Sequence, residues 1–299
     1  MLPIRAVYSF VFLRAISFAA AMLFAFAAAA SGAVSVRDDS GRELRLAQPA
    51  TRIISLAPHA TELLFAAGAG TRVAAVAAWS DYPPEAAKLP QVGDAHALDI
   101  ERIVALRPDL VVAWSSGNSA SQIAQLEARG IAVFRSDPQR VEEVATNLER
   151  LGALAGTDAT AALAARRFRE GFTELARSHA RRAPVKLFYE IWGEPLMTFN
   201  DKHIVSDVMR LCGARNVFGD SPLLTPTVPV EAVISAAPDL IISGTGAEVL
   251  QAWRRWPQIP AVKNAKLCTV DPAHMHRAGP RLLEGARELC NCIDAARGK

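Results

Sequence analysis

The chain has 299 residues, and its 33 lysines and arginines against 30 aspartates and glutamates give a formal net charge of +3. A balance this close to neutral gives no reason to expect nucleic acid or an acidic surface as a partner. The length is too great for one typical core and is sufficient for two lobes.

Residues 1–33 have the pattern of a secretory signal peptide. Arg5 and Arg14 precede an uncharged run over residues 16–30, and Ser31-Gly32-Ala33 fits a cleavage site. The apolar run is too short for a membrane anchor, and nothing later in the sequence resembles a second span. No cysteine lies at the predicted cleavage site, so we expect no lipid anchor. Cleavage would remove two arginines and no acids, and we expect a soluble mature protein in a bacterial periplasm, with a net charge near +1.

A first α/β lobe is predicted over residues 34–140. Residues 34–46 favour a hairpin with its turn at Asp38 to Gly41. Asp99 is suited to cap a helix that ends before Pro108. Strand and helix signals alternate along the lobe, which predicts a mostly parallel sheet covered by helices. The predicted strands are 52–56, 73–79, 110–114 and 132–135, and the predicted helices are 61–67, 99–106 and 119–129.

Residues 141–183 are predicted to form a helical linker with a break near Gly156-Thr157. Phe168, Phe172 and Leu175 make one apolar stripe at helical spacing, so this long helix can act as a stiff strut. A second α/β lobe is predicted over residues 184–299, where the alternation repeats. The predicted fold class is therefore α/β, with two lobes of mostly parallel sheet covered by helices and joined by a single long rigid helix.

Three of the five tryptophans, Trp79, Trp114 and Trp192, follow short apolar runs typical of strands buried on both faces. The carboxyl ends of strands in open α/β sheets face the ligand crevice. One such indole could merely close the end of a core. Three of them favour a crevice built for a large flat ligand.

One spacing occurs twice. Glu101 lies seven residues before Pro108-Asp109-Leu110, and Glu231 lies seven residues before Pro238-Asp239-Leu240. Each glutamate is predicted in the first turn of a short helix, where an acid contributes about 0.3–1 kcal/mol through the helix dipole. Helix capping explains one such residue. Two at matched positions suggest a pair of exposed charges that engage two equivalent receptors.

Four cysteines in an oxidising compartment indicate a disulfide. Cys290 and Cys292 are two residues apart on a predicted helix, so their side chains point in different directions and should not pair with each other. The other pairings stay open on this reasoning.

Several segments resemble the periplasmic cobalamin-binding proteins of ABC importers, a class that also carries haem and iron–siderophores. The resemblance covers residues 34–299. The Ile-Glu…Pro-Asp-Leu pattern marks the class, whereas Ser-Asp-Tyr-Pro-Pro and the Ala-Trp after the third strand point more narrowly to cobalamin. The segments are residues 52–68, Trp79-Ser-Asp-Tyr-Pro-Pro, residues 99–114 and Arg277-Ala-Gly-Pro-Arg.

The resemblance implies a monomeric binding protein that is not an enzyme, has no resident cofactor and holds cobalamin as its transported ligand. Glu101 and Glu231 would dock on the two membrane subunits of the permease, and Cys212 would pair with Cys290. No metal site is expected. The predicted ligand-binding residues are Trp79, Tyr82, Trp114, Trp192, Ala273, His274, Met275, His276 and Arg277.

The loop before Arg277 departs from the family pattern. Ala273 stands where an acid is usual, and His274 and His276 appear beside it. These histidines could donate hydrogen bonds to corrinoid amides, ligate a metal centre, or have no role.

Haem or iron–siderophore binding by the same fold is the nearest alternative. Haem carriers of this class often present a tyrosine just after the glycine that is here Gly93, where this chain has Asp94. The aspartate at this position counts against haem binding. Four histidines still leave haem binding open: His59, His96, His274 and His276.

Two further classes have less support. A metal-ion carrier would need three or four converging ligands, and the sequence has no tight cluster of them. An enzyme is disfavoured because the sequence has no Gly-x-Ser-x-Gly elbow, P-loop or Cys-x-x-Cys motif.

Overall fold

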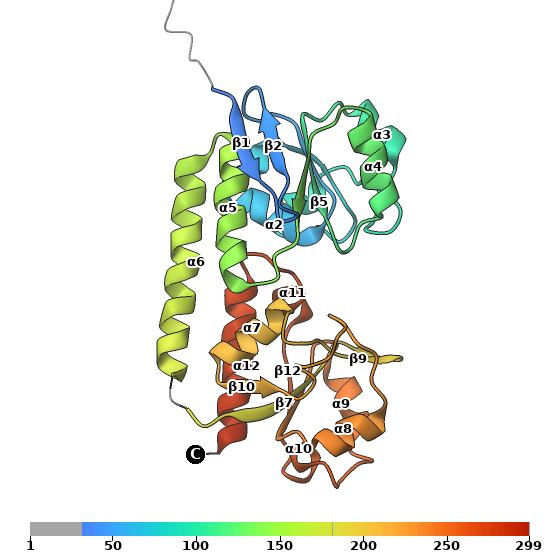
Figure 1. Cartoon of the computed structure of the whole chain (residues 1–299), viewed down its shortest axis with the longest axis vertical. Helices are drawn as coiled ribbons and strands as arrows, with labels where there is room; N and C mark the ends of the chain where they lie inside the picture. Colours follow the sequence, from blue (N-terminus) through green and yellow to red (C-terminus); the bar gives the residue numbers. More distant parts are fainter. Residues whose placement is uncertain (1–31, 181, 299) are drawn as a thin grey trace, which may run out of the picture. The chain divides into compact units, whose positions relative to one another are not determined.

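Two four-stranded parallel sheets form the framework of the computed structural model, which describes residues 32–180 and 182–298 (Figure 1). From residue 34 onward the chain forms one compact unit. The predicted signal peptide lies outside the described residues, except for Gly32 and Ala33. The lobe boundaries at residues 140 and 184 stay predictions.

The first sheet has the order β4-β3-β5-β6, with helices on both faces. Its strands are mostly apolar because both faces are covered, although Ser55 ends β3 and Arg135 and Ser136 end β6. Ile53 and Val112 contribute to one core, whereas their strand neighbours Ile54 and Val111 contribute to another. The elements are β3 (Ile53–Ser55), α2 (Pro58–Ala66), η1 (Gly70–Arg72), β4 (Val73–Val76), η2 (Ala86–Lys88), α3 (Ile100–Ala105), β5 (Leu110–Trp114), α4 (Ala120–Ala128) and β6 (Val133–Ser136), preceded by the antiparallel hairpin β1 (Val34–Arg37) and β2 (Glu43–Leu46).

The second sheet has the order β10-β7-β11-β12 and repeats this plan. Of its two central strands, β11 is buried along its whole length and β7 at every position except Lys186. A short antiparallel hairpin, β8 and β9, follows the first of them. The elements are β7 (Val185–Glu190), β8 (Trp192–Gly193), β9 (Leu196–Met197), α7 (Ile204–Leu211), β10 (Ala214–Asn216), α8 (Val230–Ala236), β11 (Leu240–Ser243), α9 (Ala247–Trp253), α10 (Pro260–Lys263), β12 (Leu267–Thr269), α11 (Pro272–Met275) and α12 (Leu282–Arg297).

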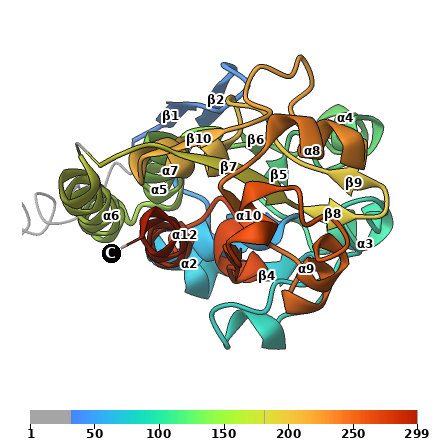
Figure 2. The ribbon, with the colours of Figure 1, turned by 90° about the horizontal axis from the view of Figure 1, so that it is seen from below.

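Two antiparallel helices, α5 (Val141–Ala155) and α6 (Asp158–His179), connect the two sheets in sequence. The predicted break falls between them, where Gly156 takes the left-handed conformation (φ +62°) that favours glycine at a helix end. Seen from below, α6 lies beside α12 (Figure 2).

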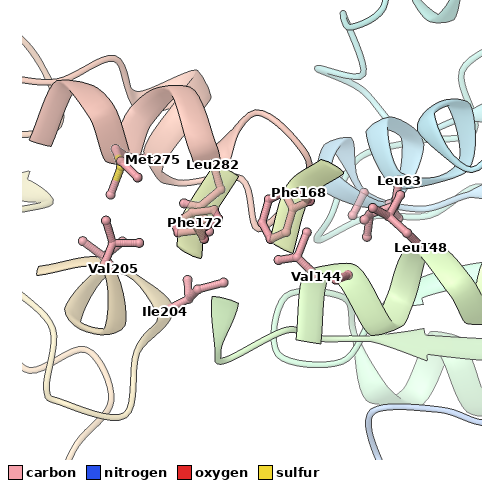
Figure 3. Close-up of a cluster of buried hydrophobic side chains, with 14 of the residues drawn as sticks. Leu63, Val144, Leu148, Phe168, Phe172, Ile204, Val205, Met275 and Leu282 are labelled. Carbon is pink, nitrogen blue, oxygen red and sulfur yellow. The ribbon is translucent and has the colours of Figure 1, made fainter. Parts of the chain in front are cut away.

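The apolar stripe of α6 is buried in a core shared by both lobes. Phe168 and Phe172 lie 4.8 Å apart between their ring centroids. Figure 3 shows them between side chains of the first lobe and side chains of the second lobe, so α6 packs against both. The labelled residues are Leu63, Val144, Leu148, Phe168, Phe172, Ile204, Val205, Met275 and Leu282. The predicted fold class, two parallel-sheet lobes joined by a long helix, is confirmed.

Two disulfides fasten α12 to the second lobe. Cys290 is bonded to Cys212 at the end of α7, which is the pair that the resemblance implies. Cys292 is bonded to Cys268 in β12, a second bridge that was not predicted. Two residues on a helix differ by about 200° in direction, so α12 can be tied to two different elements through neighbouring cysteines.

None of the described helices is long and apolar enough to cross a membrane.

Candidate ligand-binding site

A cavity of about 340 Å³ lies between the two lobes, a volume within the range of about 300–1,000 Å³ that is usual for small-molecule sites. The first lobe contributes residues that follow the carboxyl ends of β3, β5 and β6, the ligand edge of a parallel sheet. The second lobe contributes the start of α7, a loop before α8 and the segment after α11. The cavity is lined by Pro58, His59, Trp114, Ser116, Asp137, Pro138, Gln139, His203, Ile204, Leu224, Thr225, His276, Arg277 and Ala278.

The wall from the first lobe is an indole whose orientation is fixed by hydrogen bonds. Trp114 Nε1 donates to Asp137 Oδ1 at 3.1 Å, and its backbone N–H donates to Asn118 Oδ1 at 2.7 Å. Ser116 Oγ donates to the same Asp137 oxygen at 2.8 Å. The His59 ring meets the indole edge to face at 5.7 Å. Trp114 therefore faces the cavity in a preformed position.

The wall from the second lobe is a cluster of aromatic and imidazole rings. His203 stacks on Phe199 at 3.9 Å with an interplanar angle of 11°. His276 lies edge to face against Phe199 and Tyr189, and Tyr189 Oη is 3.0 Å from His276 Nε2. These contacts come from β7, the segment after β9, the start of α7 and the end of α11, so tertiary packing alone assembles this wall.

Buried imidazoles in this cavity are neutral at pH 7. Burial lowers the pKa of His59 to about 4 and that of His203 to about 3, with the nearby His276 adding to the second shift. Burial also lowers the pKa of His276 to about 4, and the charge of Asp271 opposes that shift. The cavity therefore presents uncharged histidines to a ligand.

A network of charged side chains joins the lobes below the cavity. Glu62 of α2 is buried and accepts from Arg281 at 2.6 and 3.0 Å and from Arg277 at 3.2 Å. Arg277 also donates to Asp81 at 2.5 Å and to the carbonyl of Trp79 at 3.1 Å. The Arg277 guanidinium lowers the pKa of Asp81. Arg277 thus lines the cavity while its guanidinium is held by the opposite lobe.

Of the nine predicted ligand-binding residues, the structure brings Trp114, His276 and Arg277 together in the cavity. Trp79 is 77% exposed and adjoins the cavity through the bond between its carbonyl and Arg277. Trp192 is 56% exposed in the β8–β9 hairpin and does not line the cavity.

The other four predicted residues lie around this site. Tyr82 lies under the Arg281 guanidinium, 4.1 Å from its ring centroid. His274 binds Glu288 at 2.8 Å, and Met275 is buried in the shared core beside Ala273 of the same short helix. These four do not line the cavity, and their contact with a ligand stays a prediction.

Several lining residues were missed from the sequence. Asp137 follows the buried strand β6, so the rule applied to the tryptophans could have found it. His59 was considered only for haem. His203 and Glu62, which lies beside the cavity, carry no comparable signal, because His203 caps α7 and Glu62 lies within α2.

The paired glutamates are exposed on the first turns of α3 and α8. Asp99 caps α3 through a 2.9 Å bond to the backbone of Arg102, so Glu101 is not needed as the cap. Neither Glu101 nor Glu231 forms a hydrogen bond or ion pair with another described residue. Both charges are therefore free to meet an external partner.

A cavity between two parallel-sheet lobes, joined by a long helix and lined by an oriented indole, defines a two-lobed substrate-binding protein. Residues 53–273 match the family described as periplasmic binding protein, and the chain belongs to this family. The prediction of a binding protein, not an enzyme, is confirmed.

Similar proteins share most of their length with this chain. The vitamin B12-binding protein of Vibrio cholerae serotype O1 is 35% identical over 250 residues, which are 83% of this chain and 91% of that one. The vitamin B12-binding protein of Photorhabdus laumondii is 38% identical over 245 residues, 81% of this chain and 88% of that one. The crystal structure of the periplasmic vitamin B12-binding protein BtuF of Vibrio cholerae matches with a TM-score of 0.79 at 34% identity, covering 84% of this chain and 99% of that one.

Proposed function

We propose that this protein captures cobalamin in the periplasm and delivers it to the two membrane subunits of an ABC importer. Cobalamin is then its transported ligand and not a cofactor. The observation that carries the proposal is the oriented Trp114 in a cavity between lobes, in a chain similar over most of its length to two proteins named for vitamin B12 binding. We further propose that the protein acts as a monomer.

Trp79 supports a ligand contact at the edge of this cavity. Its φ of +66° is rare for a bulky residue and costs on the order of 1–3 kcal/mol. Arg277 holds the carbonyl of this residue, while the indole stays 77% exposed. A strained backbone conformation at a residue with a large exposed apolar ring supports a role for that ring in binding.

Haem binding by the same fold is the alternative to test. Asp94, which stands at the tyrosine position of haem carriers, accepts from the backbone of His96 and Ala97 at 2.8 Å in a tight turn. Calorimetric titration with cyanocobalamin, cobinamide and haem separates the candidates. Binding of haem with a Soret shift, and no heat from either corrinoid, would refute the proposal.

Trp114→Ala is expected to weaken cyanocobalamin binding by about 1–3 kcal/mol, because it removes apolar surface that the ligand would bury. Isothermal titration calorimetry measures the change. Leu163→Ala, which shortens a partly exposed apolar side chain on α6, is the control and should leave the affinity unchanged. Equal affinities for all three proteins would place the ligand away from Trp114.

Reversing both docking charges, Glu101→Lys with Glu231→Lys, is expected to abolish cobalamin uptake while leaving ligand affinity intact. Exposed ion pairs contribute only about 0–1 kcal/mol each, so the pair acts mainly on orientation and encounter with the permease. A cell-based uptake assay measures the effect. Glu248→Lys is the matched control, since Glu248 is an exposed acid in the first turn of α9. Normal uptake by the double variant would contradict the docking role and leave the two glutamates only a helix-stabilising one.

A further inference from the structure

His203 presents an unpaired N–H group to the cavity. It caps α7, and its Nδ1 accepts the backbone N–H of Val205 at 3.2 Å. A neutral imidazole that accepts at Nδ1 carries its proton on Nε2. The stack on Phe199 holds the ring in this orientation.

Nothing in residues 32–180 and 182–298 accepts the Nε2–H of His203. This nitrogen is also absent from the buried side-chain atoms that lack a partner in the same ranges, so solvent reaches it. Because His203 lines the cavity, the open side of the nitrogen is the ligand side.

His276 also has an N–H group that can donate to the ligand, and Tyr189 fixes which nitrogen carries the proton. Tyr189 is fully buried, and burial raises the pKa of its hydroxyl, which keeps its proton. Within the described chain that hydroxyl has one partner, His276 Nε2. If the hydroxyl accepted from this nitrogen, its own buried O–H would have no acceptor, so the hydroxyl donates and the His276 proton lies on Nδ1. Tyr189 therefore positions a second N–H donor on a ring that is open to the cavity.

We propose that His203 and His276 donate hydrogen bonds to carbonyl oxygens at the rim of the ligand, and that neither ring coordinates the metal at its centre. This rests on the proposed function, since amide groups surround a corrinoid. A histidine that binds a metal offers one lone pair to it and usually donates its other N–H to the protein. His203 has the reverse pattern, because its lone pair caps the helix and its N–H faces the ligand.

A matched pair of variants tests the donor role. His203→Gln keeps an N–H donor near the position of Nε2, whereas His203→Phe keeps a flat ring against Phe199 and has no donor. Both lose the helix cap, so its loss cancels in the comparison. The dissociation constant for cyanocobalamin should rise about 5- to 10-fold in His203→Phe and stay within about 3-fold of wild type in His203→Gln. Equal affinities for the two variants would overturn the donor role while leaving the proposed function in place.

Aquacobalamin tests the second half of the proposal, because its axial water can be replaced by an imidazole. The visible spectrum of aquacobalamin should be unchanged on binding to the wild-type protein. A spectral change that disappears in His203→Phe or in His276→Phe would show coordination and overturn the proposal. Absence of any corrinoid binding by wild type would overturn the proposed function and this inference together.

Discussion

Glu62→Gln is expected to lower the free energy of unfolding by about 3–5 kcal/mol. Removing one member of a buried ion pair leaves its partner charge without compensation. Glu62 has a side-chain exposure of 1%, and the side chain of Arg281 beside it has 13%. Arg277 keeps Asp81 as a partner, so most of the cost falls on Arg281. Urea unfolding followed by circular dichroism measures the change.

The matched control for this variant is Glu284→Gln, the same substitution on an acid of α12 whose side chain is 54% exposed. It should change the free energy of unfolding by less than about 1 kcal/mol. A loss of similar size in both variants would mean that the network between the lobes adds no more stability than a surface contact.

Acid is expected to destabilise the protein through His59. The ordinary pKa of histidine is about 6.5, whereas the pKa of His59 in the folded protein is about 4. Between these two pH values the unfolded chain binds a proton at His59 and the folded protein does not. Stability therefore falls as the pH falls, by about 1.4 kcal/mol per pH unit and about 3 kcal/mol in total. Above pH 6.5 His59 is neutral in both states and contributes no pH dependence.

The measurement is the slope of the unfolding free energy against pH from 6.5 to 4.5, in wild type and in His59→Phe. In His59→Phe the Ser136 hydroxyl loses its hydrogen-bond partner, which lowers the free energy of unfolding by the same amount at every pH. The slope against pH, and not the absolute value, therefore tests the prediction. His96→Phe, at an exposed histidine, is the control and should keep the wild-type slope. Identical slopes in all three proteins would mean that His59 titrates normally in the folded state.

Under the proposed function, these two features contribute to one ligand site between the lobes. Glu62 holds Arg277 of the second lobe at the floor of the cavity, and the neutral histidines line its walls. The neutral imidazoles can donate hydrogen bonds without bringing a charge of their own that binding would have to compensate.

Local patterns predicted most elements of the first lobe, although β4 ends at Val76 and not at Trp79. Strand β5 ends at Trp114 as predicted, because an apolar run between Pro108 and the polar residues after Trp114 leaves one place for a buried strand. Asp99 caps α3 because its carboxylate reaches a backbone N–H three residues on. Gly156 separates α5 from α6 because a glycine accepts the left-handed turn at a helix end. Each of these depends on neighbours within a few residues.

The sequence by itself determined the two parallel-sheet lobes, the long helix between them and the place of Trp114 at the carboxyl end of β5. Only the tertiary structure decided which side chains meet across the lobes: Glu62 binds Arg281, 219 residues away, and Tyr189 orients His276, 87 residues away. The tertiary structure also decided that Met275 enters the core and that Cys268 pairs with Cys292. The physical reason is that hydrophobic periodicity reports how buried a residue is, whereas a polar contact depends on the relative position of two distant elements.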